Sequence, residues 1–231
     1  MEEFIIEATV GMQSKRAAVM VGRLNPPTAG HYRVLDSMKA FIRDVPDLKL
    51  TAPVLVIVSG EKTSKDKSKN PLTAEERVKF IEASGRANGV IVLAAESGFA
   101  AFEAVRKAGY EPIAVAAGSD RADKYIEMLD KYFTDSNGGK IKHTKVTGLD
   151  REGQDGKKNQ KTTAMEKALG ELKQGGELDI AEVSGSMARR AVQLDYQDEF
   201  AQIVGLEKKP KLAKLMFDKV KASLGGDDGA S

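Results

Sequence analysis

Short apolar runs alternate with helical patterns along residues 16–133, and this alternation constrains the fold more than any other feature. The runs typical of strands buried on both faces are VMVG, VLVIVSG, VIVLAA and IAVAAG. The segment KIKHTKV alternates more and predicts a further strand. Because intervening helices allow successive strands to run parallel, we predict an α/β fold. Its sheet is expected to be doubly wound and mainly parallel, with about five or six strands.

The segments between and after the apolar runs have helical spacing. Apolar residues recur from Val34 to Ile42, which predicts an amphipathic helix that begins between Ala29 and Tyr32. The pattern LTAEER resembles a capping box and predicts the start of another helix. In the C-terminal third we predict a helix over 165–173, a strand and turn in LDIAEVSGS, and helices near 187–194, 198–204 and 212–220.

Changes in composition divide the chain into three predicted parts. Residues 1–15 form an N-terminal extension, residues 16–205 form the alternating domain, and residues 206–231 form a C-terminal helix with a frayed tail. Within the domain, residues 150–163 are polar and contain glycine. We therefore expect a loop or a flexible insertion at that position.

Composition and charge exclude several classes of protein. The chain has no cysteine, which excludes a disulfide framework and a thiolate metal site, and its formal net charge is only +2. No apolar run approaches the ~20 residues that span a bilayer, and acidic residues at the start do not fit a secretory signal. We expect a cytoplasmic protein without a membrane or nucleic-acid partner, and homo-oligomer formation stays open.

The turn GRLNPPTAGH after the first strand is the first candidate site. Ligands of doubly wound sheets bind where a strand turns into a helix, and the free amides of that helix favour an anion. Gly22 permits a tight turn, Gly30 permits close approach of a backbone, and Thr28 and His31 flank the helix start. These side chains suit a phosphate group. A histidine that only caps the helix is the alternative.

The segment VSGSMARR is the second candidate site. Ser184 and Ser186 precede a predicted helix, and Arg189 follows one turn later. Hydroxyls, free amides and a fixed guanidinium charge form a second phosphate-binding arrangement. The alternative is an ordinary helix cap.

In this order, the two segments resemble the two signatures of the nucleotidylyltransferase superfamily, (His/Thr)-x-Gly-His and Ile-Ser-x-Thr-x-x-Arg. Valine replaces isoleucine at Val183, and Ser186 replaces threonine. NPLTAEERV resembles a segment of adenylyltransferases in that superfamily, and AAGSDR resembles their nucleotide-contacting turn. The resemblance covers residues 16–205 and implies a Rossmann-like fold.

The resemblance also implies the reaction and its residues. A substrate phosphate attacks the α-phosphorus of a nucleoside triphosphate and pyrophosphate leaves, with no covalent enzyme intermediate. His31, Thr28 and Arg189 are implied as catalytic, and Mg²⁺ is implied to be held mainly by the substrate phosphates. The implied nucleotide-binding residues are Gly22, Arg23, Leu24, Gly30, Gly118, Asp120, Ser184, Gly185 and Ser186. For Asp120, a helix cap is the alternative.

The segments GRLNPP and NPLTAEER look more like enzymes that adenylate a small phosphorylated metabolite than like cytidylyltransferases. We therefore predict transfer of AMP from ATP, rather than CMP from CTP, to nicotinamide mononucleotide. Flavin mononucleotide and phosphopantetheine stay open as acceptors, and so does a nucleotide-binding regulator without turnover.

Two further segments leave alternatives open. Lys62, Lys65, Lys67 and Lys69 follow the second strand and form either a lid over the triphosphate or a solvated loop. His143 is predicted as a strand residue near the surface, without a role.

The start of the chain offers a competing hypothesis. Ile5, Ile6, Glu7 and Ala8 resemble the protease site that ends the capsid-targeting peptides of internal head proteins in large tailed phages. That resemblance implies a phage protein, made in the host cytoplasm and packaged in the virion, with the capsid and its protease as partners. An amphipathic N-terminal helix packed on the domain is the alternative.

Overall fold

The computed structural model describes residues 15–117, 119–134, 138–146, 158–180 and 183–225. Within them lies one five-stranded sheet with the order β3-β2-β1-β4-β5. All neighbouring strands pair in parallel. The strands are β1 (Lys15–Gly22), β2 (Leu50–Val58), β3 (Ile91–Ala95), β4 (Tyr110–Ala116) and β5 (Thr144–Lys145). The predicted doubly wound, Rossmann-like α/β fold is confirmed, with five strands in the described residues.

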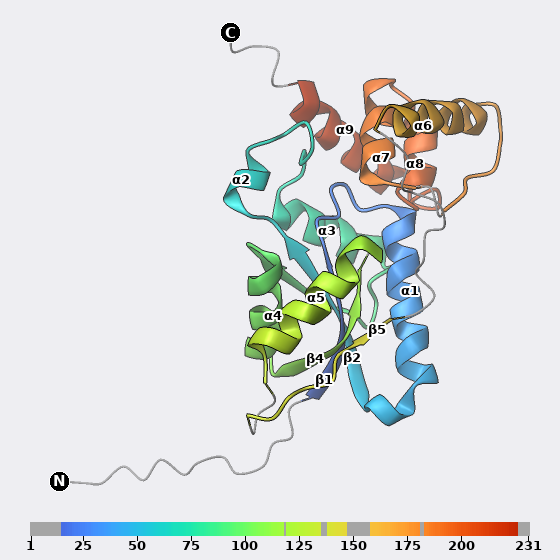
Figure 1. The fold of residues 1–231 in the computed structure, drawn as a ribbon. Helices are drawn as coiled ribbons and strands as arrows, with labels where there is room; N and C mark the ends of the chain where they lie inside the picture. Colours follow the sequence, from blue (N-terminus) through green and yellow to red (C-terminus); the bar gives the residue numbers. More distant parts are fainter. Residues whose placement is uncertain (1–14, 118, 135–137, 147–157, 181–182, 226–231) are drawn as a thin grey trace.

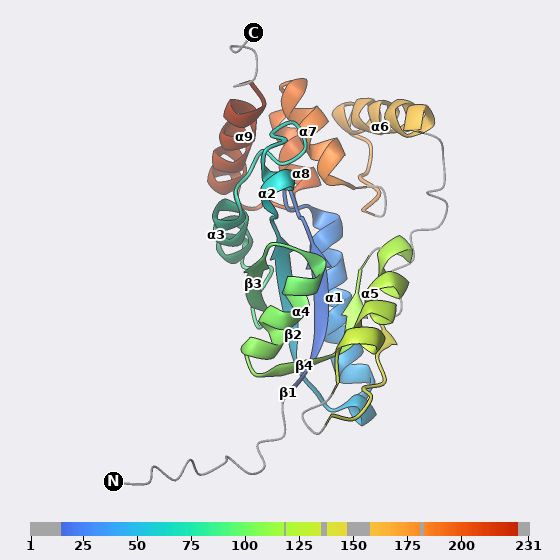
Figure 2. The same ribbon diagram turned by 60° about the vertical axis from the view of Figure 1, so that its left-hand side comes forward.

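Helices cover both faces of the sheet because side chains of the central strand are buried alternately on each side. Ala18 and Met20 pack with α1 (Ala29–Asp44) and α3 (Ala74–Ser84). Ala17 and Val19 pack on the other face, with α4 (Gly98–Lys107) and α5 (Ser119–Tyr132). Figures 1 and 2 show these layers. Two short helical turns, η1 (Pro46–Leu48) and α2 (Glu61–Ser64), lie in the connections around β2.

The strand order places a topological switch at the centre of the sheet. The chain proceeds from β1 outward through β2 to β3, and then returns to β4 on the other side of β1. Ligands of such sheets bind outside the carboxyl ends of the strands at this switch. The loop that follows β1, residues 23–28, therefore occupies the expected position of a ligand site.

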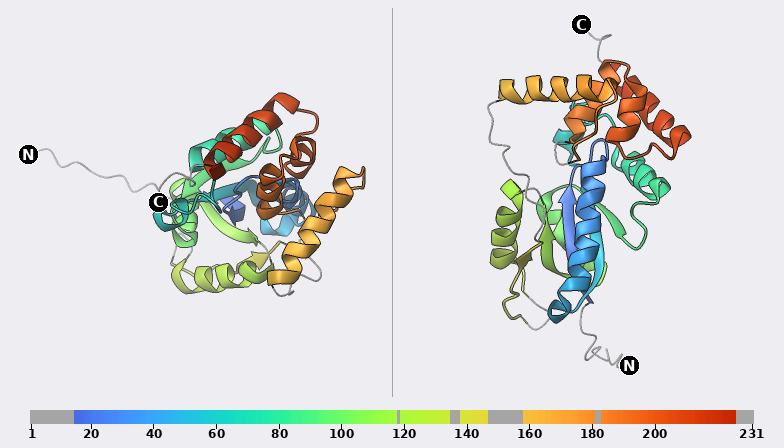
Figure 3. Two further views of the ribbon diagram at one scale, coloured as in Figure 1. Left: turned by 90° about the horizontal axis from the view of Figure 1, so that it is seen from above. Right: turned by 90° about the vertical axis from the view of Figure 1, so that its right-hand side faces the viewer.

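The C-terminal helices form a separate group at the carboxyl end of the sheet, which Figure 3 shows from two sides. They are α6 (Lys158–Lys173), α7 (Gly185–Gln193), α8 (Gln197–Ile203) and α9 (Pro210–Gly225). Their apolar faces share one cluster with Leu72 and Phe80. After α8, Gly205 adopts a φ of 67°, and a Cβ there would lie 3.5 Å from Ala29 Cα. The helical group is thereby packed against the start of α1.

The structure differs from the sequence-based expectations in four segments. Residues 158–163 belong to α6, although the polar composition predicted a loop there. The expected strand in LDIAEVSGS does not form in its described residues, 178–180 and 183–186. Part of the lysine-rich loop is helical as α2, and the strand expected in KIKHTKV is only Thr144–Lys145.

His143 is buried rather than near the surface, and its Nδ1 lies 2.6 Å from Asp130 Oδ1. Tertiary packing of α5 beside β5 covers it, and the alternating local pattern could not show that.

Two other expectations concern the N-terminus and membranes. Residues 5–8, on which the phage hypothesis depends, lie outside the described residues. Among the described helices, none is both long and apolar enough to cross a membrane.

Candidate active site

Contacts of Gly22 and of the β1–α1 loop, residues 23–28, fix the loop in one conformation, and local sequence patterns predict only some of these contacts. A Cβ at Gly22 would lie 2.6 Å from Leu24 Cδ1, and Leu24 itself has a φ of 47°. Asn25 is buried, and its amide pairs with both backbone groups of Leu72, at 2.8 Å and 3.0 Å. The loop is thus fixed to the segment that precedes α3, so its backbone is preorganised.

Thr28 and His31 form a reciprocal arrangement at the start of α1. The backbone N–H of Thr28 donates to His31 Nδ1 at 3.1 Å, and Thr28 Oγ1 lies 2.8 Å from the same nitrogen. A backbone N–H can only donate, so Nδ1 accepts, and a neutral imidazole then carries its proton on Nε2. The half-buried ring therefore has its donor on Nε2, beside the positive end of the α1 dipole.

The Thr28 side chain is fully buried. Its position suits orienting the His31 imidazole, and a phosphate could reach the Thr28 hydroxyl only if the hydrogen bond between Thr28 Oγ1 and His31 Nδ1 broke.

Helix α7 brings the second motif to the same loop. Arg189 Nη1 donates to Asn25 O at 2.6 Å, and Nη2 donates to Ser186 Oγ at 3.0 Å. Gly185 permits this approach, because a Cβ there would lie 3.0 Å from Asn25 O. Ser184 is the N-cap, and its hydroxyl accepts from Met187 N at 3.2 Å. The cap and the arginine contact thus coexist, and Arg189 joins two motifs that are far apart in the sequence.

Arg77 in α3 binds the backbone of the β1–α1 loop, although the sequence motifs did not indicate it as a site residue. Its guanidinium is buried and donates to three backbone carbonyls: Thr73 at 3.1 Å, Val58 at 3.2 Å and Arg23. These carbonyls belong to the start of α3, the end of β2 and the β1–α1 loop. Arg77 is the last residue of the segment NPLTAEER, but its burial depends on the contact between α3, β2 and the β1–α1 loop in the folded protein.

The guanidinium groups of Arg77 and Arg189 both lie close enough to Arg23 to be affected by its charge. Burial, with repulsion from Arg23, lowers the pKa of Arg77 to about 10. Burial and then Arg23 also lower the pKa of Arg189, while the Asp66 carboxylate raises it. Arg23 is exposed at the loop. Its charge makes the charged forms of Arg77 and Arg189 less favourable. A bound anion would relieve this repulsion, so the site is suited to an anion.

The lysine-rich loop, residues 61–70, is folded around Asp66. Lys69 Nζ and Ser68 Oγ each donate to this carboxylate at 2.6 Å, and these bonds, with the Lys69 charge and backbone N–H, lower its pKa to about 2. Lys65 forms an ion pair with Glu61 at 2.8 Å. The side chain of Lys62 lies outside the described residues. The loop contributes both signs of charge, and through Asp66 it acts on Arg189.

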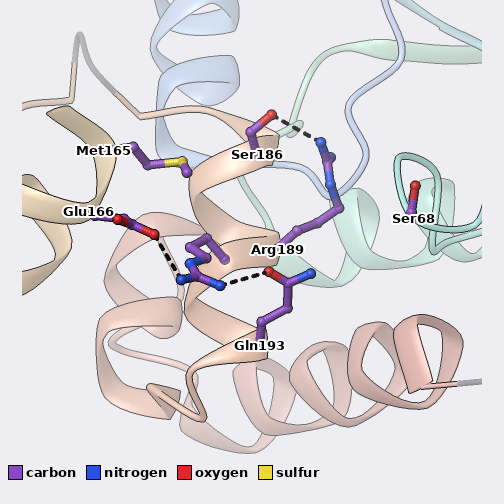
Figure 4. Close-up of a pocket in the computed structure, with 7 residues that line it drawn as sticks. Ser68, Met165, Glu166, Ser186, Arg189 and Gln193 are labelled. Atoms are coloured by element: carbon purple, nitrogen blue, oxygen red, sulfur yellow. Dashed lines mark hydrogen bonds and ion pairs between the residues drawn. The ribbon is translucent and has the colours of Figure 1, made fainter. Parts of the chain in front are cut away.

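A cavity of about 350 Å³ lies between this loop and helices α6 and α7. Figure 4 shows its walls, with Ser186, Arg189 and Gln193 on α7, Met165 and Glu166 on α6, and Ser68 opposite. Arg190 also lines it, although neither signature motif includes this residue.

The structure brings together most of the candidate site residues. Gly30 is buried in the first turn of α1, and Leu24 is buried in the loop. Gly118 lies outside the described residues, and for Asp120 only the backbone position in α5 is described. In the described part of the chain, no group of three His, Asp or Glu side chains could hold a metal ion.

Comparison with known proteins agrees with this geometry. A family model described as cytidylyltransferase-like matches residues 19–138, which span β1 to α5 and contain the first motif. The superfamily resemblance drawn from the motifs is confirmed by this match, although α7 and the second motif lie beyond the matched range. No curated protein matches the chain. The match supports nucleotidyl transfer as the general activity.

Proposed function

The chain belongs to the cytidylyltransferase-like family, and on that premise we propose that it is an adenylyltransferase. It transfers AMP from ATP to a small phosphorylated acceptor and releases pyrophosphate. Nicotinamide mononucleotide is the proposed acceptor, because the segments GRLNPP and NPLTAEER resemble those of enzymes that adenylate such metabolites.

One observation carries the proposal most directly: the His31 imidazole is fixed with its Nδ1 toward the Thr28 backbone N–H. A fixed donor on Nε2 can stabilise negative charge that develops on a phosphate oxygen. Since donors set in place before the reaction cost no reorganisation during it, this arrangement favours catalysis over simple binding.

The proposed reaction has one displacement step. An oxygen of the acceptor phosphate attacks the α-phosphorus of ATP, a new phosphorus–oxygen bond forms, and the bond to the bridging oxygen of the β-phosphate breaks. The electron pair of that bond leaves with pyrophosphate. His31 would donate to a non-bridging oxygen of the α-phosphate as its charge grows, and the α1 dipole would add to this effect.

The leaving pyrophosphate would be held by the second motif. Arg189 and Ser186 are already bonded to each other, and Arg189 is held against the β1–α1 loop. Arg23 is exposed at the same loop and would add a further cation. Magnesium would enter as part of the nucleotide substrate, coordinated by phosphate oxygens and water, and it would neutralise charge on the leaving group.

A cytidylyltransferase is the second candidate, because the description of the matching family names that activity. The two candidates use the same phosphate chemistry and differ only in the base that the enzyme accepts.

The testing experiment is a pyrophosphate-release assay with Mg²⁺, ATP or CTP, and three acceptors: nicotinamide mononucleotide, flavin mononucleotide and phosphopantetheine. We expect release with ATP that depends on one acceptor. His31→Ala should lower the rate on the order of a hundredfold or more, because it removes a transition-state donor.

Arg33→Ala is the matched control, since Arg33 is exposed on the same helix. Release with CTP alone would establish the cytidylyl alternative. Folded protein that releases pyrophosphate with no pair of substrates would refute the enzymatic proposal.

A further inference from the structure

The cavity beside α7 continues the candidate site beyond the second motif. Ser186, Arg189, Arg190 and Gln193 recur at helical spacing and line it, while the opposite side of α7 is buried. Arg190 lies four residues after Ser186, which is ~6 Å farther along the helix axis. A chain of phosphates that leaves Arg189 in this direction would next meet Arg190.

The contacts that hold the Arg190 guanidinium are ones that a bound anion could replace. Its Nη2 donates to Glu166 Oε1 at 2.8 Å, and its Nη1 lies 3.4 Å from Gln193 Oε1. Its Nε is buried and has no hydrogen-bond partner in the described part of the chain. The ion pair with Glu166 is partly exposed, at 36% and 47% for the two side chains, so solvent weakens it.

A phosphate is a stronger partner for this guanidinium than the carboxylate that occupies it. A phosphate group carries up to two negative charges and can accept two parallel N–H bonds from arginine. The cavity also supplies the Ser186 hydroxyl, which accepts from Arg189 and keeps its own proton for an anion. In return, Glu166 would repel the arriving anion until its bond to Arg190 opened.

We propose that Arg190 recognises the terminal phosphate of the nucleoside triphosphate, and that Glu166 is the resident counter-ion which this phosphate displaces. The inference rests on the proposed function, which places the leaving pyrophosphate at Arg189 and Ser186, and it assigns the outer phosphate of that group to Arg190. It makes Arg190 the residue that distinguishes a triphosphate from a diphosphate. It also makes Glu166 a competitor for the Arg190 guanidinium, so that its carboxylate opposes the binding of the terminal phosphate.

Neither helix depends on the ion pair for its position. Helix α6 is anchored by buried Leu169 and Leu172, and α7 is anchored by buried Ala188 and Val192. Substitutions at Glu166 and Arg190 are therefore expected to leave the fold intact, and thermal unfolding would verify this.

The test measures binding to the full chain by calorimetry, with a non-hydrolysable ATP analogue, ADP, AMP and inorganic pyrophosphate. Arg190→Gln should weaken the ATP analogue ~10-fold or more, while leaving AMP unchanged and ADP nearly so. Glu166→Gln should tighten the ATP analogue and pyrophosphate severalfold at low salt. Arg190→Lys keeps the charge without the two-pronged geometry and should give an intermediate loss.

Glu171→Gln is the matched control on α6, since Glu171 pairs with Lys167 at 3.6 Å and does not line the cavity. Equal losses for the ATP analogue and AMP in Arg190→Gln would overturn the proposal, and so would unchanged binding of the ATP analogue. An effect confined to pyrophosphate would show that the cavity does not contact the bound triphosphate, and it would also overturn the proposal. This test measures binding and not turnover, so the two proposals can fail separately. Selective triphosphate binding here, with no pyrophosphate release in the assay of the proposed function, would refute the proposed function and leave the role of Arg190 standing.

Discussion

Replacing Arg77 with methionine should destabilise the whole protein, because this guanidinium connects three segments beneath the site. Methionine has similar length and no donor. The carbonyls of Val58 and Arg23 would lose the guanidinium bonds described above, and Thr73 O would keep its bond from the Arg77 backbone N–H. An acceptor left unpaired costs at most ~1–3 kcal/mol, and both bonds are only part-buried, so the loss is at most ~2–6 kcal/mol.

Relief of the buried charge offsets part of this cost. Burial lowers the pKa of Arg77 to about 10, so its charged form is disfavoured in the folded protein. We therefore expect a net loss of ~3 kcal/mol, which lowers Tm by ~6–12 °C for a chain of this size. The assay is thermal unfolding by circular dichroism at neutral pH. Arg77→Lys keeps the charge and should give a smaller loss.

Arg33→Met is the control, because Arg33 is exposed on α1. Its expected change in unfolding free energy is within ~0.5 kcal/mol. A Tm for Arg77→Met within ~2 °C of the wild type would refute the reasoning, because it would mean that the loop does not depend on this arginine.

Three further predictions concern the site and its neighbouring loop. Gly185→Ala would place a Cβ 3.0 Å from a carbonyl oxygen of the β1–α1 loop, so α7 must shift. We expect calorimetry to show ATP binding weakened ~10-fold, with little change in Tm. Unchanged affinity would contradict this. Thr28→Val removes one of the two hydrogen bonds to His31 Nδ1 and should lower kcat/KM ~5- to 10-fold. Thr28→Ser keeps the hydroxyl and should retain most activity. Equal rates in the two variants would argue against an orienting role for the hydroxyl. The Asp66 carboxyl should titrate at about pH 2 in an NMR titration, and Lys69→Gln should move this midpoint toward its ordinary value of 3.8. Since the folded pKa is the lower one, the stability that Asp66 contributes is present above pH 3.8 and is lost as pH falls through about 2; an unchanged midpoint in the variant would exclude Lys69 as the cause.

Several contacts of the site could not have been predicted from local patterns. Asn25 reads as an ordinary turn residue, yet its side chain pairs with Leu72, far along the chain. Arg190 reads as one more polar residue on a helix, and only the neighbouring α6 supplies Glu166. Burial and pairing of polar groups depend on which distant segments meet, and short-range spacing carries no information about that.

The sequence by itself determined the elements and the chemistry of the two motifs. Apolar runs and helical spacing follow from short-range periodicity, so the strands from β1 to β4 and the start of α1 at Ala29 agree with the prediction. Residue types alone placed hydroxyls, glycines and an arginine at two helix starts. Only the tertiary structure decided that Arg189 reaches Asn25 across 164 residues and that Thr28 turns its hydroxyl to His31. Strand order and helix packing bring those groups together, because long-range contacts form only when the apolar faces of distant segments are buried against one another.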